Sequence, residues 1–163
     1  MSSPKDGQTG PDGSAFGGPA GQAGRGDTRL AFVWIPEGEY AAALARWPHL
    51  AEPGGAAAGE DGRAVSHRQY CRRLDAHATN YAAAAAAQGG RVDIVLAPLT
   101  IAAFAAWCAE RVEDEHDANA RAGWAAEAAH AGGADLIGWP PASRGECWCG
   151  SGRRYKSCCR TER

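Results

Sequence analysis

Apolar residues in this chain form short continuous runs and longer stretches in which they recur every three or four positions. The runs at residues 30–35 and 92–97 are rich in β-branched residues and predict buried strands, and residues 135–139 predict a short third strand. The recurring stretches predict four helices, over residues 37–47, 66–88, 100–112 and 118–130. This order predicts an α/β or α+β fold, a small helix-rich domain with two or three short strands whose order stays open.

Several residues predict how the helices begin and which face they bury. Ser66 with Gln69 three positions later forms the pattern of a capping box, and Thr100 is a candidate N-cap for the third helix. In that helix, the spacing of the apolar residues Ile101, Phe104, Cys108 and Val112 predicts one shared buried face. Trp34, Trp47 and Trp107 also fall on positions that we expect to face the core.

The first 28 residues differ in composition from the rest of the chain, being rich in glycine and nearly free of apolar residues. Such a segment cannot bury enough surface to offset the entropy of ordering, so we expect a disordered arm over 1–28. It lacks the apolar core of a secretion signal, and no run approaches the ~20 apolar residues of a membrane span. We therefore expect a cytoplasmic protein with no membrane span, a domain of unknown function over 29–140 and a small module over 141–163.

Four of the six cysteines lie within thirteen residues near the end of the chain: Cys147, Cys149, Cys158 and Cys159. A closed set of four thiolates is typical of a structural zinc site, which leaves no position open for water. Gly150 and Gly152 allow a sharp turn between the two pairs, and we expect residues 153–159 to form about two helical turns. The sequence predicts one Zn²⁺ per chain, although iron also fits four thiolates, and a segment without a core of its own that is ordered only by metal.

The stretch CWCGSGRRYKSCC resembles the SEC-C motif, a small zinc-binding module named for the C-terminus of the SecA translocase ATPase. Residues 136–141 and 104–108 are similar to SEC-C proteins of actinobacteria. The resemblance implies that the four cysteines are the zinc ligands and that the module docks onto a partner protein. It does not extend to a motor, because the chain has no phosphate-binding loop of the type G-x-x-x-x-G-K-[ST].

Charge is distributed unevenly around this module. Residues 141–163 carry six Lys and Arg against two Glu, which leaves 11 basic and 17 acidic residues in the rest of the chain. Arg153, Arg154, Tyr155 and Lys156 therefore form a candidate basic, aromatic surface for an acidic protein partner. An accessory protein that binds nucleic acid through the same residues is an alternative, but the acidic remainder of the chain opposes it.

An enzyme with a site in residues 29–140 is the other alternative. No nucleophile with a base and an orienting partner can be named there, so we expect a protein that is not an enzyme. His67 and Cys71 are neighbours on one helix, but Cys71 and Cys108 are better interpreted as small core residues. The acidic residues between Glu110 and Asp117 lack the spacing of a calcium loop, and we interpret them as a solvated surface.

Overall fold

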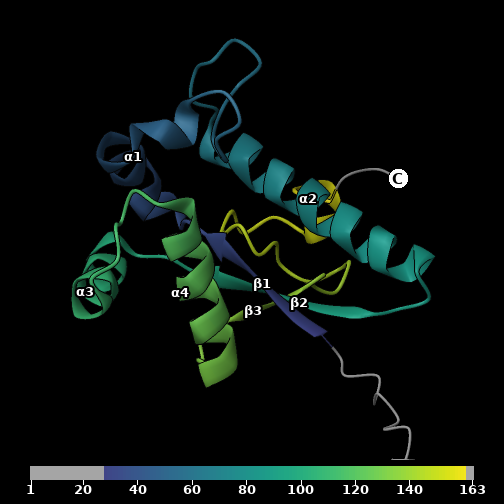
Figure 1. The fold of residues 1–163 in the computed structure, drawn as a ribbon. Helices are drawn as coiled ribbons and strands as arrows, with labels where there is room; N and C mark the ends of the chain where they lie inside the picture. The colour runs from purple at the N-terminus through teal and green to yellow at the C-terminus, as the bar shows by residue number, and fades with distance from the viewer. Residues whose placement is uncertain (1–27, 161–163) are drawn as a thin grey trace, which may run out of the picture.

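The computed structural model describes residues 28–160, and within this range it has four α-helices and one sheet of three strands (Figure 1). The arm predicted over residues 1–28 lies outside the described residues, except for Thr28, which begins the first strand. Among residues 28–160, no helix combines the length and apolar content that crossing a lipid bilayer requires. The fold is α+β and small, as the pattern of apolar residues predicts.

The sheet has the order β1-β2-β3 and mixes two strand directions. β1 (Thr28–Trp34) runs parallel to β2 (Val92–Pro98), with Leu30 opposite Ile94 and Phe32 opposite Leu96. β3 (Ile137–Trp139) lies antiparallel to β2 on its other side, with Trp139 opposite Ile94. Strand β2 is therefore central, which agrees with its continuous apolar run.

The helices are α1 (Glu37–Arg46), α2 (His67–Ala87), α3 (Ile101–Arg111) and α4 (Ala118–Ala131), and short 3-10 helices follow at Pro48–Ala51 and Tyr155–Ser157. The sequence predicted all four α-helices to within a few residues. The 3-10 helix at Pro48–Ala51 was not predicted, because Pro48 was expected to end α1 with no further helix after it.

Helices α2 and α4 cover opposite faces of the sheet. The ring of Phe32 on β1 packs edge-on against His77 and Tyr81 of α2. The neighbouring residue Ala31 lines one groove together with Ala126 of α4. Successive side chains of a strand point to opposite faces, so the two helices lie on different sides.

At the N-termini of the helices, the predicted cap of α2 is confirmed and the predicted cap of α3 is wrong. Ser66 and Gln69 form the predicted capping box at the start of α2. Thr100 occupies the N-cap of α3, but its side chain makes no capping hydrogen bond. The backbone N–H of Ile101 donates instead to the Glu39 carboxylate of α1 at 3.0 Å, so the cap comes from another helix.

The predicted buried face of α3 is wrong at its last position. Phe104 and Cys108 are buried, whereas Val112 is 93% exposed. The helix ends at Arg111, and Val112 takes the left-handed conformation with φ 59° and ψ 37°. Because the chain turns there, the helical spacing no longer determines which way Val112 points.

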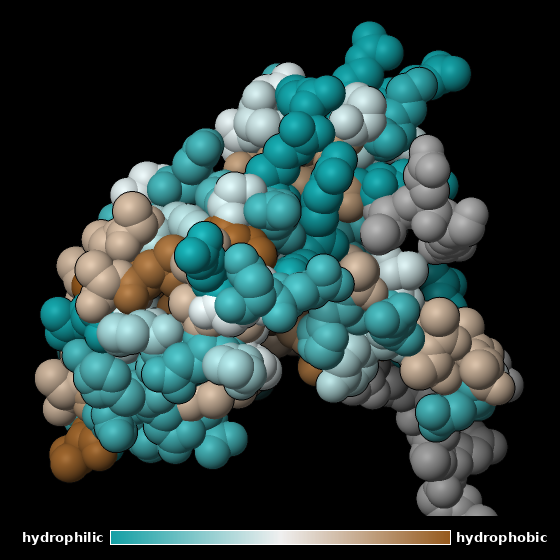
Figure 2. Space-filling model, turned by 90° about the horizontal axis from the view of Figure 1, so that it is seen from above, coloured by the Kyte–Doolittle hydropathy of each residue, from teal (hydrophilic) through white to brown (hydrophobic). Residues whose placement is uncertain are grey.

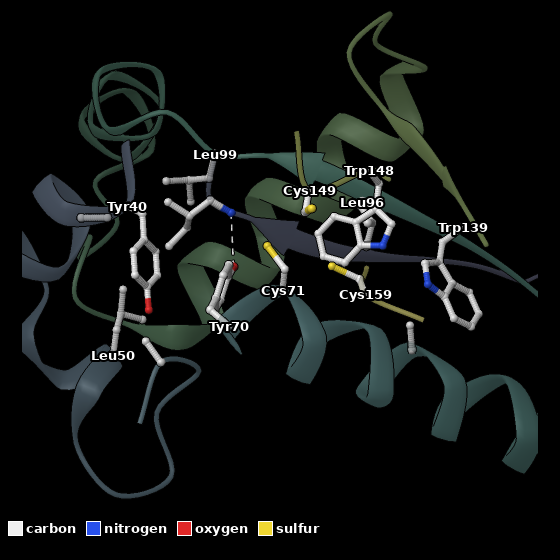
Figure 3. Packing of buried hydrophobic residues seen from close by; sticks show 14 of the residues in the cluster. Tyr40, Leu50, Tyr70, Cys71, Leu96, Leu99, Trp139, Trp148, Cys149 and Cys159 are labelled. Carbon is white, nitrogen blue, oxygen red and sulfur yellow. Dashed lines mark hydrogen bonds between the residues drawn. The ribbon is translucent and has the colours of Figure 1, made fainter. Parts of the chain in front are cut away.

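The C-terminal segment shares the main core of the molecule. Cys147, Trp148, Tyr155 and Cys159 belong to the same buried cluster as Leu96. In Figure 3, Trp148 and Cys159 lie on the side of the sheet that faces α2. The indole of Trp148 packs edge-on against Trp34 of β1 with ring centroids 6.0 Å apart. The segment has no core of its own, as predicted, but it packs into the core that α2 and the sheet supply. The expectation that metal alone orders it stays a prediction.

Candidate metal centre

The first pair of cysteines lies on a tight turn held by main-chain hydrogen bonds. The N–H of Cys147 donates to Arg153 O at 2.7 Å, and the N–H of Tyr155 donates to Gly145 O at 3.0 Å. Between these bonds the chain reverses through Gly150 at φ 80° and Gly152 at φ 67°, conformations that strain any residue with a Cβ atom. The glycines thus perform the role that the sequence predicted for them.

The second pair follows a single 3-10 turn at Tyr155–Ser157, so the prediction of two helical turns over residues 153–159 is wrong. Arg154 is extended at ψ 139°, which prevents a helix from starting before Tyr155. Cys158, at φ −122° and ψ −86°, leaves helical geometry immediately afterwards. The short turn brings Cys158 and Cys159 back to the first pair.

The four sulfur atoms form one buried cluster. The Sγ atoms of Cys147, Cys149, Cys158 and Cys159 all lie within 4.8 Å of one another, and each residue is at most 4% exposed. The Sγ atoms of Cys149 and Cys158 are 3.6 Å apart, and those of Cys158 and Cys159 are 3.9 Å apart. All four are free thiols.

These separations fit a tetrahedral metal site. Four sulfur ligands at ~2.3 Å from a central Zn²⁺ lie about 3.8 Å from one another by tetrahedral geometry. The two measured separations bracket this value. A disulfide requires sulfurs at about 2.0 Å, far closer than any pair here. The donor set and its geometry therefore suit a thiophilic metal ion.

The electrostatics of the cluster also favour a cation. Burial raises the pKa of the Cys147 thiol to about 12. A hydrogen bond with Cys71, followed by burial, raises the pKa of Cys159. Burial alone would raise the pKa of Cys158 too, but hydrogen bonds from the Ser151 hydroxyl and the neighbouring thiols lower it below the ordinary value. Burial thus opposes ionisation of Cys147 and Cys159, and a positive ion among the sulfurs would favour it.

A buried carboxyl group on α2 fixes the C-terminal segment in place. Asp75 is 1% exposed, and its Oδ1 accepts hydrogen bonds from Trp139 Nε1 at 2.8 Å, Tyr155 Oη at 2.8 Å and Trp148 Nε1 at 3.4 Å. One turn earlier, Arg72 Nε donates to the carbonyl of Cys158 at 3.0 Å. The segment that carries the four cysteines is therefore attached to α2 by hydrogen bonds to both Asp75 and Arg72. No local pattern in the sequence distinguishes Asp75 from the other acidic residues.

A fifth thiol lies beside the cluster. Cys71 of α2 is fully buried, and its sulfur is gathered with those of Cys149 and Cys159 in Figure 3. Its Sγ is 3.5 Å from His67 Nε2. The sequence correctly placed Cys71 in the core and beside His67, but it could not reveal that α2 crosses the metal centre at this point. Cys108, the sixth cysteine, is buried on α3 as predicted.

The candidate docking surface is smaller than predicted. Arg153, Arg154 and Lys156 are exposed, and none of them forms an ion pair within the part of the chain that the structure describes. The side chain of Tyr155 is not on this surface, since it is 4% exposed and points to Asp75. Viewed from above, the molecule is mostly hydrophilic, with hydrophobic residues confined to small areas (Figure 2).

No other metal-binding cluster of cysteine, histidine or acidic residues occurs among residues 28–160. The acidic residues between Glu110 and Asp117 accordingly form no such group. Glu115 instead pairs with Arg46 of α1 at 2.8 Å, and Asp117 caps α4 by accepting from the N–H of Asn119. These two side chains therefore have structural roles.

Comparison with known proteins identifies the C-terminal segment. Residues 146–160 match the family model of the SEC-C motif, and this range contains all four clustered cysteines. No curated protein matches the chain, and no solved structure matches it. The family match therefore covers the metal centre and not the preceding domain.

Proposed function

We propose that the SEC-C motif of this chain holds one zinc ion and that the loaded motif presents a basic surface to an acidic protein partner. The observation that supports zinc most strongly is the set of four buried cysteine sulfurs within 4.8 Å of one another. Zinc would supply the positive charge that lets all four buried thiols ionise. Because four sulfurs complete the tetrahedron, the site is structural and offers no open position for catalysis.

The chain's own residues prepare the site. Gly150 and Gly152 turn the backbone between the pairs, and the Ser151 hydroxyl lies 3.2 Å from the sulfurs of both Cys149 and Cys158. A hydroxyl at that distance donates to a thiolate and orients it toward the metal. Asp75 and Arg72 hold the motif against α2, so the ion would link the C-terminus to the domain core.

Metal analysis of the purified full-length protein tests the zinc proposal. We expect about one zinc per chain and little iron, and we expect a Cys158→Ser, Cys159→Ser double variant to lose the metal. A Cys108→Ser variant is the matched control, because that cysteine is equally buried but lies on α3. Stoichiometric zinc in the double variant would refute the assignment of the ligands.

The docking proposal is supported by the charge and exposure of Arg153, Arg154 and Lys156. These three cations lie within four residues on the turn between the two cysteine pairs, and no acidic side chain among the described residues forms an ion pair with them. An acidic surface on another protein would complement them. The metal would keep the three side chains in a fixed arrangement by bracing the turn from inside.

Charge reversal tests docking without damage to the fold. Truncation before residue 142 would remove Trp148 and Tyr155 from the core, so loss of binding in such a variant would be uninformative. A variant with Arg153, Arg154 and Lys156 all changed to Glu should keep its zinc but lose a nuclease-resistant protein partner in affinity capture. A variant with the exposed Arg63 and Arg91 changed to Glu is the control. Equal capture by both variants, or a bound species that nuclease removes, would contradict docking to a protein.

A further inference from the structure

A cavity lies between α2 and the loop that precedes it, and none of its lining residues is one of the four clustered cysteines. Its volume is about 400 Å³, and small-molecule sites in proteins measure about 300–1,000 Å³. Residues 54–56 of the loop line one side. Helix α2 lines the other side with Tyr70, Arg73, Leu74 and His77, which share one face of the helix because they recur every three or four positions.

The loop side of the cavity is fixed by close contacts with the rest of the fold. The N–H of Gly55 donates to Glu52 O at 2.8 Å, and the N–H of Ala57 donates to Leu50 O at 2.6 Å. A Cβ atom on Gly55 would collide with the carbonyl oxygen of His49, so the loop can approach this closely only with glycine there. The cavity is therefore formed before any ligand arrives, as small-molecule sites usually are.

The side of the cavity formed by α2 is basic. Arg73 and His77 are exposed neighbours on the helix surface, and no acidic residue among those described lines the cavity. Arg73 forms no ion pair within the part of the chain that the structure describes. The ring of His77 packs edge-on against Phe32 and Tyr81, with centroids 5.2 Å and 4.9 Å away, so its orientation is held. A guanidinium group binds phosphate or carboxylate through two parallel hydrogen bonds, and an imidazole adds a ring N–H.

The loop adds main-chain donors to these side chains. The N–H groups of Gly54 and Ala56 donate to no acceptor within residues 28–160. Gly54 has φ 86°, and turns that contain such left-handed residues present N–H groups that bind anions. These donors outnumber the two oxygens of a carboxylate, whereas a phosphate group offers three oxygens and is the better match. Leu74 and Tyr70 supply apolar surface beside the donors.

We propose that this cavity is a binding site for a small organic phosphate. Arg73 holds the phosphate group through its guanidinium fork, and His77 and the main chain of residues 54–56 complete its hydrogen bonds. The organic part of the ligand packs against Leu74 and Tyr70. The site is separate from the metal centre, so it does not depend on the proposed zinc ion.

Titration of the zinc-loaded full-length protein with phenyl phosphate, followed by the amide resonances in NMR, tests this site. We expect saturable shifts at residues 54–56 and at Arg73 and His77, and none at residues 147–159. Inorganic phosphate should shift the same amides at higher concentration, because it lacks an organic part to pack against Leu74. Benzoate should bind more weakly than phenyl phosphate. The absence of saturable shifts, or shifts centred on residues 153–156, would overturn the proposal. Benzoate binding as tight as that of phenyl phosphate would overturn the choice of phosphate.

Two variants and a control assign the binding to named side chains. Arg73→Ala should weaken phenyl phosphate binding by about tenfold or more, the effect of losing hydrogen bonds to a charged group. His77→Phe keeps a ring against Phe32 and Tyr81 but loses the donor, and should weaken binding by about threefold. Arg68→Ala is the control, because Arg68 is an exposed cation of α2 that does not line the cavity. Equal weakening by Arg73→Ala and Arg68→Ala would overturn the proposal in favour of general attraction between charges.

Discussion

Replacement of Asp75 tests how the metal centre is joined to the domain. The carboxyl oxygen Oδ1 accepts from Trp139, Trp148 and Tyr155, which all lie on the C-terminal side of α4, while Asp75 itself lies on α2. In Asp75→Ala, the three donors lose this acceptor inside the core. In Asp75→Asn, an amide oxygen can still accept at the same place.

The magnitude follows from the geometry. The bonds from Trp139 and Tyr155 are 2.8 Å long, whereas the bond from Trp148, at 3.4 Å, is weak. A buried donor that loses its partner costs ~1–3 kcal/mol, so two strong bonds give about 2–6 kcal/mol for Asp75→Ala. Because Asp75→Asn keeps an accepting oxygen, this variant should lose less, about 1–2 kcal/mol.

Urea unfolding of the zinc-loaded full-length protein measures both free energies. Because whole domains are stable by only ~5–15 kcal/mol, Asp75→Ala should lower the unfolding midpoint substantially. Asp93→Asn is the control, since the ion pair of Asp93 with Arg29 at 2.9 Å is half exposed and such pairs contribute ~0–1 kcal/mol. A loss below about 1 kcal/mol in Asp75→Ala, or equal losses in Asp75→Ala and Asp75→Asn, would refute the role assigned to this oxygen.

Three further predictions concern strain, pH and protons. Val112→Gly should raise the free energy of unfolding by about 1 kcal/mol, because valine at φ 59° is strained; a lower urea midpoint would contradict this. Burial, followed by Arg121, lowers the pKa of His49 below its ordinary 6.5, so the unfolded chain binds the proton first and stability falls as pH falls through 6.5. The urea midpoints of His49→Gln should depend less on pH in that range, and an equal dependence would contradict it. Zinc binding at pH 7 should release at least two protons, from Cys147 and Cys159, measured by calorimetry in buffers of different ionisation enthalpy; release of fewer than one would contradict the raised pKa values.

Local patterns in the sequence predicted most of the elements. The strands β1 and β2, the four helices and the capping box at Ser66 each depend on residues close together in the chain. The cysteine spacing likewise predicted the cluster, because two glycines and a short turn suffice to bring the pairs together. Residues close together in the chain determine these features, so the sequence alone predicts them.

Features that depend on contacts between distant elements were missed or wrong. Tyr155 looked like a surface residue because its neighbours are basic, but its hydroxyl reaches Asp75, eighty positions earlier in the chain. Glu39 caps α3 across a similar gap, which left Thr100 without that role. The position of Cys71 near the four clustered cysteines likewise depends on the path of α2 across the sheet. Such contacts leave no periodic signal in a single sequence.

Zinc K-edge X-ray absorption of the purified full-length protein tests the central claim most directly, because it counts and identifies the ligand atoms. Our account predicts four sulfur ligands at ~2.3 Å and no oxygen or nitrogen in the first coordination sphere. A sphere containing oxygen or nitrogen, or fewer than four sulfurs, would contradict a closed site formed by Cys147, Cys149, Cys158 and Cys159.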